Sequence, residues 1–286
     1  SRPRETAAPK PLDEDLDFFG LTDQGRRREK NEDAFLYGTL HKSMRVRGTN
    51  LPNPALLELP SQRLASFAVV ADGVGGRSGG EVASRAALEA LAGYVIHTME
   101  SFYAVDTGDE AAFLESLRHG ARRAHEMIVA RADASGDGRG MATTLTAIVA
   151  IWPWLYVLHV GDSRCYRWRR GTLEQLTKDQ TMAQDLVDSG ALPPERVATS
   201  PFSRMLSSSL GGQTSRPVVT KASLELGDIV LLCTDGLTKH VPDDAIAARL
   251  GNLSSSEQAA RALVDDALAD GGTDNVTVLV LRAIVR

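Results

Sequence analysis

Phe67-Ala68-Val69-Val70-Ala71-Asp72-Gly73 is the stretch of sequence that decides the fold. An unbroken apolar run that ends in Asp-Gly is typical of a buried strand with a turn beyond it. The pattern predicts a core strand whose end places the Asp72 carboxylate at the edge of a sheet.

Three further Asp residues stand at the end of an apolar run in a similar way: Asp162 after the run 155–160, Asp235 after 229–234 and Asp274 before 276–281. We expect the four carboxylates to converge on one cleft, where their mutual repulsion requires a cation. Mg²⁺ and Mn²⁺ are hard ions that take oxygen ligands, so the pattern predicts a site for one of them.

Length, composition and charge bound the class of protein. A chain of 286 residues suits one large domain or two small ones, and its 43% of apolar residues are enough for a sizeable core. The formal net charge of −5 argues against nucleic acid as the main partner. Cys165 and Cys233 are the only cysteines, which is too few for a disulfide framework and suits a reducing compartment.

No apolar run approaches the roughly 18 residues of a membrane span, and no secretory signal pattern opens the chain. We therefore expect a cytoplasmic protein that does not associate with membranes.

Residues 1–16 are expected to form a flexible tail, because they are rich in Pro, Ala and charge, and residues 17–286 to form the folded domain. Helices are expected over 81–97, 109–132 and 258–269, with Val82 on the apolar stripe of the first. The segment 41–63 is expected to be a loop or an irregular hairpin. Strands and helices come in runs rather than in alternation, which favours antiparallel sheets with helices outside, an α+β fold.

Arg26, Arg27 and Arg28 stand shortly before Glu32 and Asp33. An arginine run is often only a solvated loop. Here anion-binding and cation-binding groups occur within a few residues, which strengthens the case for a binding site.

Taken in chain order, the motifs resemble those of the metal-dependent serine/threonine protein phosphatases of the 2C type, in their compact bacterial branch. They are Arg28-x-x-x-Glu32-Asp33, Asp72-Gly73, Gly161-Asp162-Ser163-Arg164, Thr234-Asp235-Gly236 and Gly272-Thr273-Asp274-Asn275. Each is weak alone, because Asp-Gly is an ordinary turn dipeptide. Five in this order are specific, and the resemblance runs from about residue 18 to residue 284.

The resemblance implies a β-sandwich of two antiparallel sheets flanked by antiparallel helix pairs, a four-layer αββα arrangement. It implies a metal site at one end of the sandwich and a flap over about 191–209 beside the substrate cleft. It also implies two core Mg²⁺ or Mn²⁺ ions and a third, weaker one.

The resemblance assigns roles to individual residues. Asp72 bridges the two core ions, the Gly73 carbonyl binds one of them, and Asp235 and Asp274 ligate the other. Asp162 joins Asp235 at the third ion. The remaining roles are those of Glu32 and Asp33, which hold metal-bound waters, and of Arg28, which binds the substrate phosphate.

The implied reaction is hydrolysis of phosphoserine and phosphothreonine in proteins by direct attack of water. Two dications bind phosphate oxygens and make a bound water more acidic, while a guanidinium at Arg28 offers a planar fork to two phosphate oxygens. Such a reaction needs no Ser or Cys nucleophile, so Cys233 is expected to be a packing residue. His159 lies inside an apolar strand and is expected to be packed in the core.

The chain departs from the family at positions where relatives carry histidines. Val74 and Arg77 occupy two such positions, and Gln180 replaces the His of a Lys-Asp-His pattern. These changes leave the metal core intact and make the proton donor to the leaving oxygen an open question.

Two other functions stay open at this point. One is a catalytically weak module that binds phosphoproteins, although none of the metal-ligand Asp residues is lost. The other is an enzyme for small phosphate monoesters. The expected partners are phosphorylated proteins, a Ser/Thr kinase or its targets, and the expected state is a monomer.

Overall fold

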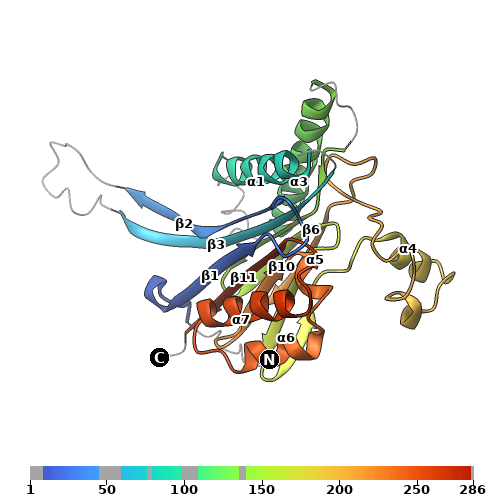
Figure 1. Cartoon of the computed structure of the whole chain (residues 1–286). Coiled ribbons are helices and arrows are strands. Elements are labelled where there is room, and N and C mark those ends of the chain that lie inside the picture. The colour runs from blue at the N-terminus through green and yellow to red at the C-terminus, as the bar shows by residue number, and fades with distance from the viewer. Residues whose placement is uncertain (1–8, 45–58, 76–78, 98–108, 135–139, 285–286) are drawn as a thin grey trace, which may run out of the picture.

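The computed structural model describes residues 9–44, 59–75, 79–97, 109–134 and 140–284 (Figure 1). Two β-sheets pack against each other, and helices cover their outer faces. Every strand pairing described within the sheets is antiparallel. The expected α+β sandwich is confirmed.

The first sheet has the strand order β1-β11-β10-β7-β8. Its strands are β1 (Leu16–Asp23), β7 (Arg164–Arg169), β8 (Thr172–Gln175), β10 (Ile229–Cys233) and β11 (Val276–Ala283). The second sheet has the order β2-β3-β5-β6-β9, with β4 paired to β3. Its strands are β2 (Asp33–Met44), β3 (Leu59–Val74), β4 (Ala142–Thr143), β5 (Leu145–Ile151), β6 (Trp154–Val160) and β9 (Val218–Ser223).

Helices form the two outer layers. Helices α1 (Gly79–His97) and α3 (Glu110–Ala134) share a hydrophobic core with the second sheet. Helices α6 (Asp243–Gly251) and α7 (Ser256–Ala269) share another with the first sheet. The short elements are η1 (Asp13–Asp15), α4 (Met182–Asp188), η3 (Pro194–Arg196) and α5 (Asp235–Thr238).

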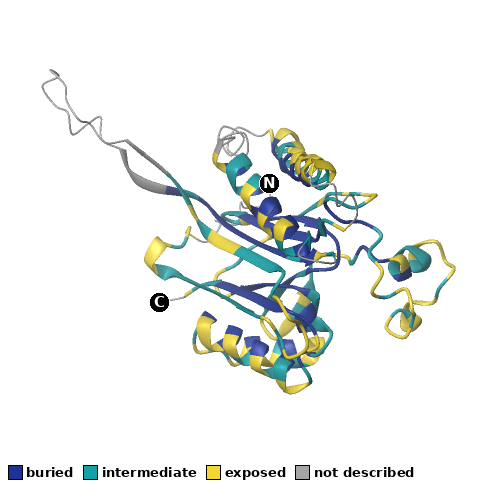
Figure 2. Cartoon of the chain, turned by 45° about the horizontal axis from the view of Figure 1, so that its top comes forward, coloured by how far each residue is buried: buried dark blue, intermediate teal, exposed yellow. Residues whose placement is uncertain are grey.

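From Phe67 to Ala71, strand β3 is buried on both faces, which explains why this stretch does not alternate between apolar and polar residues. Figure 2 shows the buried strands lying between the two outer layers of helices. Phe67, Val69 and Ala71 pack towards α1 and α3. Ala68 and Val70 pack into the core between the two sheets. Because side chains alternate along a strand, Asp72 falls on the same face as Ala68 and Val70, towards the other sheet.

Several expectations differ from the structure. Residues 1–8 lie outside the described residues, but the rest of the expected tail is folded: residues 13–15 form η1 and Leu16 begins β1. The described part of 41–63 instead agrees with the irregular hairpin that was one of its two expected forms: β2 extends to Met44, β3 begins at Leu59, and their antiparallel pairing shifts register twice. Val82 is 38% exposed, because the neighbouring Ala83 faces the core instead.

Two motif ends also differ from expectation. Strand β3 continues through Asp72 and Gly73 to Val74, so no turn follows Asp72 directly. Asp235-Gly236 opens the short helix α5 rather than a turn, and the backbone N–H of Lys239 donates to the Asp235 carbonyl. Among the described residues, no helix is long and apolar enough to cross a membrane.

His159 on β6 is buried, as expected of a packed core residue. Its Nδ1 lies 2.9 Å from Thr146 Oγ1, and its Nε2 lies 3.1 Å from the Lys178 carbonyl. Burial lowers the pKa of His159 from 6.5 to about 4. The ring is therefore neutral at pH 7.

We expect His159 to make the fold less stable in mild acid. Its folded-state pKa lies below its unfolded one, so the unfolded chain binds the proton more tightly and stability falls as the pH drops from about 6.5 towards 4. The loss should reach about 2 kcal/mol at pH 5. Urea unfolding at pH 7 and pH 5, with chelator present, measures it.

A His159→Gln variant isolates this contribution, because buried carboxyl groups elsewhere titrate in the opposite direction. The variant should lose less stability than the wild type between the two pH values. A matched change at the exposed His119, His119→Gln, controls for the loss of an imidazole that is not buried. Equal pH dependence in all three proteins would contradict the assignment.

Candidate metal centre

The core between the sheets ends in a layer of polar side chains. Thr234 stands two residues after Leu232, and Thr277 stands two residues before Leu279; both leucines pack into the core between the sheets. Thr22 pairs with Thr277 in the register of β1 and β11. The Thr234 and Thr277 hydroxyls donate to Asp33 Oδ2, at 2.8 and 2.6 Å. Thr22 Oγ1 lies 2.8 Å from Thr277 Oγ1. Strand alternation thus gathers polar groups at one end of an apolar core.

Asp33 and Asp72 are direct cross-strand neighbours in the β2–β3 pair. Burial raises the pKa of Asp33 to about 7, although the two threonine hydrogen bonds lower it. Burial, followed by the nearby Asp33 and Asp235, raises the pKa of Asp72 well above its ordinary value. Like charges placed opposite each other on adjacent strands destabilise a sheet unless a cation offsets them.

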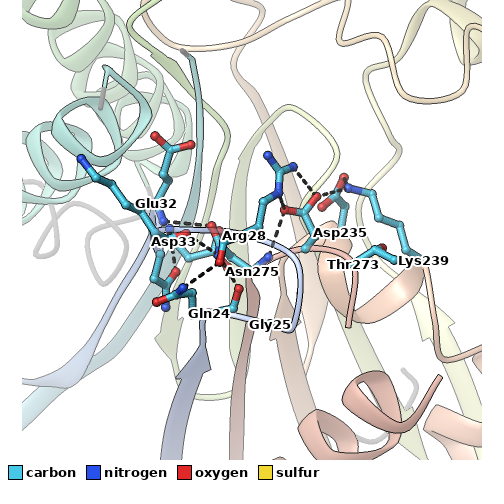
Figure 3. A network of polar contacts seen from close by, with 12 residues as sticks. Gln24, Gly25, Arg28, Glu32, Asp33, Asp235, Lys239, Thr273 and Asn275 are labelled. Carbon is cyan, nitrogen blue, oxygen red and sulfur yellow. Dashed lines mark hydrogen bonds and ion pairs between the residues drawn. The ribbon is translucent and has the colours of Figure 1, made fainter. Parts of the chain in front are cut away.

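Asp235 and Asp274 reach the same place from the other sheet. Asp235 opens α5 directly after β10, and Asp274 lies in the loop before β11. The Lys239 ammonium lies 2.6 Å from Asp235 Oδ2 and 2.6 Å from Asp274 Oδ2 (Figure 3). Burial raises the pKa of Asp274, but hydrogen bonds from Arg28 and Lys239 bring it below its ordinary value.

Arg28 binds Asp274 with both arms of its guanidinium. Nε lies 2.6 Å from Oδ1, and Nη2 lies 2.9 Å from Oδ2. The Arg28 side chain remains 51% exposed and lines the cleft. Arg28, the last of the three consecutive arginines, therefore lies at the candidate metal centre, whereas Arg26 donates to the Leu268 carbonyl.

Asn275 joins the two ends of the chain at this centre (Figure 3). Its Nδ2 donates to the carbonyls of Gln24 and Lys30, each at 2.8 Å. Its Oδ1 accepts from the Glu32 backbone N–H at 2.9 Å. The loop that carries Arg28 and Glu32 is therefore fixed against the loop that carries Asp274.

Glu32 and Asp162 complete the set of acidic groups. Both line the cleft with Asp72, and burial raises the pKa of Glu32. Asp162 is 9% exposed, and burial followed by Asp235 and Asp179 raises its pKa to about 8. Every sequence-predicted acidic residue thus lies at one end of the sandwich.

His240 holds the loop that carries Asp274. Its Nε2 lies 2.8 Å from Thr273 Oγ1 and accepts from the Thr273 backbone N–H at 3.0 Å. Its Nδ1 lies 2.9 Å from Asp270 Oδ2. His240 is therefore a supporting residue of the centre.

Gly73 is required by close backbone packing. A Cβ at this position would lie 2.3 Å from the Gly80 carbonyl oxygen and 2.7 Å from the Glu32 carbonyl oxygen. The Gly73 N–H donates to that same Glu32 oxygen at 3.2 Å. The absence of a side chain lets β3 approach both the start of α1 and the start of β2.

We expect Gly73→Ala to reduce the free energy of unfolding by about 2 kcal/mol, because the added methyl must push rigid backbone aside. Chemical denaturation of the metal-free protein measures this. Gly38→Ala is the matched control, since a Cβ at Gly38 meets nothing within 4 Å. Equal stability of the two variants would contradict the packing argument.

A cleft of about 630 Å³ opens over these groups. Its wall includes acidic residues, basic residues and part of the segment 191–209: Arg28, Glu32, Asp72, Gly73, Val74, Gly75, Asp162, Arg204, Met205, Leu206, Ser209, Asp235, Lys239, Thr273 and Asp274. Val74 forms part of this wall, and Arg77 lies outside the described residues. Gln180 accepts from the Gly161 N–H at 3.0 Å and supports the loop that carries Asp162.

The donor set fits a hard dication. Asp33 Oδ1 and Asp235 Oδ1 are buried without a hydrogen-bond partner, which is costly unless another group satisfies them. The acidic groups that converge here all present oxygen atoms, the donors that Mg²⁺ and Mn²⁺ prefer. Within the described ranges, however, no three His, Cys, Asp or Glu side chains are already grouped for one ion. The chain's own cations hold Asp235 and Asp274 instead.

Sequence reasoning missed Lys239, the supporting role of His240 and the threonine layer. Thr234 had a detectable signal, since it directly precedes the predicted Asp235 and stands two residues after the inward-facing Leu232. Lys239 had the spacing of one helical turn after Asp235, but that spacing is informative only once α5 is known to be helical.

Comparisons with known proteins place the chain among phosphatases. The family described as Protein phosphatase 2C matches residues 58–270. The serine/threonine protein phosphatase PstP of Mycobacterium tuberculosis is 37% identical over 220 residues, covering 77% of this chain but 41% of PstP. The serine/threonine phosphatase stp of Listeria welshimeri is 31% identical over 240 residues, covering 83% of this chain and 92% of stp.

Solved structures agree. The crystal structure of the M. tuberculosis serine/threonine phosphatase PstP/Ppp has a TM-score of 0.75 at 32% identity, covering 94% of this chain and 99% of that one. The PstP catalytic domain in complex with two manganese ions has a TM-score of 0.69 at 31% identity, with coverage of 94% and 99%. This chain spans about two fifths of full-length PstP.

Proposed function

This chain belongs to the protein phosphatase 2C family, and from that premise we propose that it is a metal-dependent phosphatase of phosphoserine and phosphothreonine in proteins. One observation carries the proposal. Carboxylates from both sheets converge under one cleft, and two of their buried oxygen atoms lack a hydrogen-bond partner. Such an arrangement is unfavourable without a multivalent cation.

The proposed cofactors are two Mg²⁺ or Mn²⁺ ions, as the PstP complex with two manganese ions supports. The residues proposed to hold them are Asp72, Gly73 through its carbonyl, Asp235 and Asp274, with Asp33 acting through water and Asp162 joining Asp235 at a third, weaker ion. When bound, such ions polarise phosphate oxygens and lower the pKa of water towards neutrality.

The chain's own residues bind and orient the substrate. The half-exposed Arg28 side chain presents a guanidinium at the cleft and is proposed to bind two phosphate oxygens. Asp274 and the Asn275 network fix the position of that guanidinium. Glu32 and Asp33 are proposed to hold water in the cleft by accepting its hydrogen bonds.

A cysteine nucleophile is excluded for the two cysteines present. Cys165 and Cys233 are both buried, and burial raises the pKa of Cys233 to about 12. Neither lines the cleft. Water is therefore the proposed nucleophile.

The proposed substrates are phosphorylated proteins, and the proposed biological role is to oppose a Ser/Thr kinase. Arg204 and Met205, from the segment 191–209, line the cleft, which supports the proposal that this segment lies beside a bound substrate. A single catalytic domain over residues 17–286, a monomeric state and a cytoplasmic location complete the proposal.

An assay on a phosphothreonine peptide tests the function. Turnover should require Mn²⁺ or Mg²⁺ and should stop when chelator is added. Free phosphoamino acids and sugar phosphates, assayed in parallel, should be poorer substrates than the peptide. Turnover that is insensitive to chelator would overturn the proposal, and a preference for sugar phosphates would indicate a small-molecule phosphatase.

A further inference from the structure

Lys239 places its ammonium between two carboxylates that are proposed to ligate one ion. Nζ lies 2.6 Å from Asp235 Oδ2 and 2.6 Å from Asp274 Oδ2. Lys239 lies one helical turn after Asp235, so α5 aims its side chain back at the carboxylate of its own first residue. The side chain is only 20% exposed.

We propose that Lys239 is a built-in cation that competes with the dication shared by Asp235 and Asp274, and so weakens the affinity of the centre for that ion. The inference rests on the proposed function, because it takes these two carboxylates as ion ligands. Mg²⁺ lies about 2.0–2.1 Å from the oxygens that bind it, so an ammonium in contact with the same two oxygens fills the same space. One of the two cations must leave before the other binds.

The surrounding contacts make Lys239 an incomplete substitute for the ion. The ammonium contacts Oδ2 of Asp235, whereas Oδ1 of the same residue is buried without a partner. Arg28 remains bound to Asp274 through Oδ1, at 2.6 Å from Nε. The single positive charge of Lys239 thus offsets only part of the repulsion among the carboxylates. A dication offsets more of it, which favours displacement of the Lys239 ammonium.

Lys239 should have opposite effects on the metal-free and on the metal-bound protein. Without metal, Lys239 offsets the repulsion between Asp235 and Asp274, so it stabilises the fold. With metal, the ammonium must first give up two ion pairs, which weakens metal binding. Removing the charge should therefore destabilise the metal-free protein and tighten metal binding.

Lys239→Met tests this, because it keeps the length of the side chain and removes its charge. The full chain, freed of metal, is titrated with Mn²⁺ in a calorimeter and is unfolded thermally in chelator. We expect at least one Mn²⁺ ion to bind about tenfold more tightly than in the wild type, a difference of about 1.4 kcal/mol. We expect the metal-free melting temperature to fall by about 2 °C or more.

The matched control is Lys178→Met, which removes a lysine that is 64% exposed and paired with Asp188. It should change neither quantity. Lys239→Gln provides a second uncharged variant that retains a hydrogen-bond donor, and it decides the question if Lys239→Met does not fold without metal.

The outcomes separate the inference from the function on which it rests. If the wild type binds two Mn²⁺ ions and a folded, uncharged Lys239 variant binds them with the same affinity, the inference is overturned while the proposed function stands. Failure of the wild type to bind Mn²⁺ would overturn the proposed function as well.

Discussion

The Asp72→Asn variant should lose about 10³-fold or more in kcat/KM on a phosphothreonine peptide, a loss of at least about 4 kcal/mol of transition-state stabilisation. Asp72 lies between the acidic groups of the two sheets, and its electrostatic neighbours include Asp33, Asp162, Asp235 and Asp274. An amide in its place retains the shape and removes the charge that a dication requires. Steady-state assays at saturating Mn²⁺ measure the effect.

The same variant should be more stable than the wild type when metal is absent. The folded-state pKa of Asp72 is raised, so its ionised form opposes folding at neutral pH, and the neutral Asn avoids that cost. A gain on the order of 1 kcal/mol is expected in chelator. Asp265→Asn, at an exposed position on α7, is the control and should change neither activity nor stability. A variant that loses activity and stability together would indicate a purely structural role for Asp72.

Arg28→Ala should reduce kcat/KM by about 100-fold at saturating Mn²⁺, because a planar charged donor is lost where the phosphate develops charge. Arg28→Lys should restore only part of the activity, since an ammonium cannot donate to two oxygens in the fixed geometry of a guanidinium. The assay compares a phosphothreonine peptide across the three proteins.

Arg27→Ala is the appropriate control, because Arg27 is exposed and directly precedes Arg28. Arg26 is less suitable, since it donates to the Leu268 carbonyl and its backbone N–H to that of Gly272. Equal losses in the Arg27 and Arg28 variants would indicate a diffuse basic surface in place of one phosphate-binding residue.

The sandwich and its acidic centre were predictable from the sequence because strand periodicity and the Asp positions agree. Runs such as 67–71 and 276–281 lack alternation since both faces of their strands are buried. Side chains still point alternately to the two faces of a strand, so Asp72, two residues after Val70, and Thr277, two residues before Leu279, point into the space between the sheets.

What sequence reasoning could not predict depends on distance along the chain. In the sequence, Lys239 has the pattern of a surface residue in a short polar segment. Its contact with Asp274 depends on the helical fold of α5 and on the position of the loop before β11. The role of Asn275 likewise depends on the loop from residue 24 to residue 32, about 250 positions earlier. Such contacts have no local signature.

The Asn275 contacts also bear on when the centre becomes functional during synthesis. β1 pairs only with β11 among the described strands of its sheet, and the loop that carries Arg28 is anchored by an amide close to the end of the described chain. Contacts of such long sequence separation form late, because the intervening chain must close a large loop first. A nascent chain that lacks residues 274–283 would leave the Arg28 loop without its anchor. Activity should therefore require the chain through residue 283, and a chain that ends before residue 274 should show none.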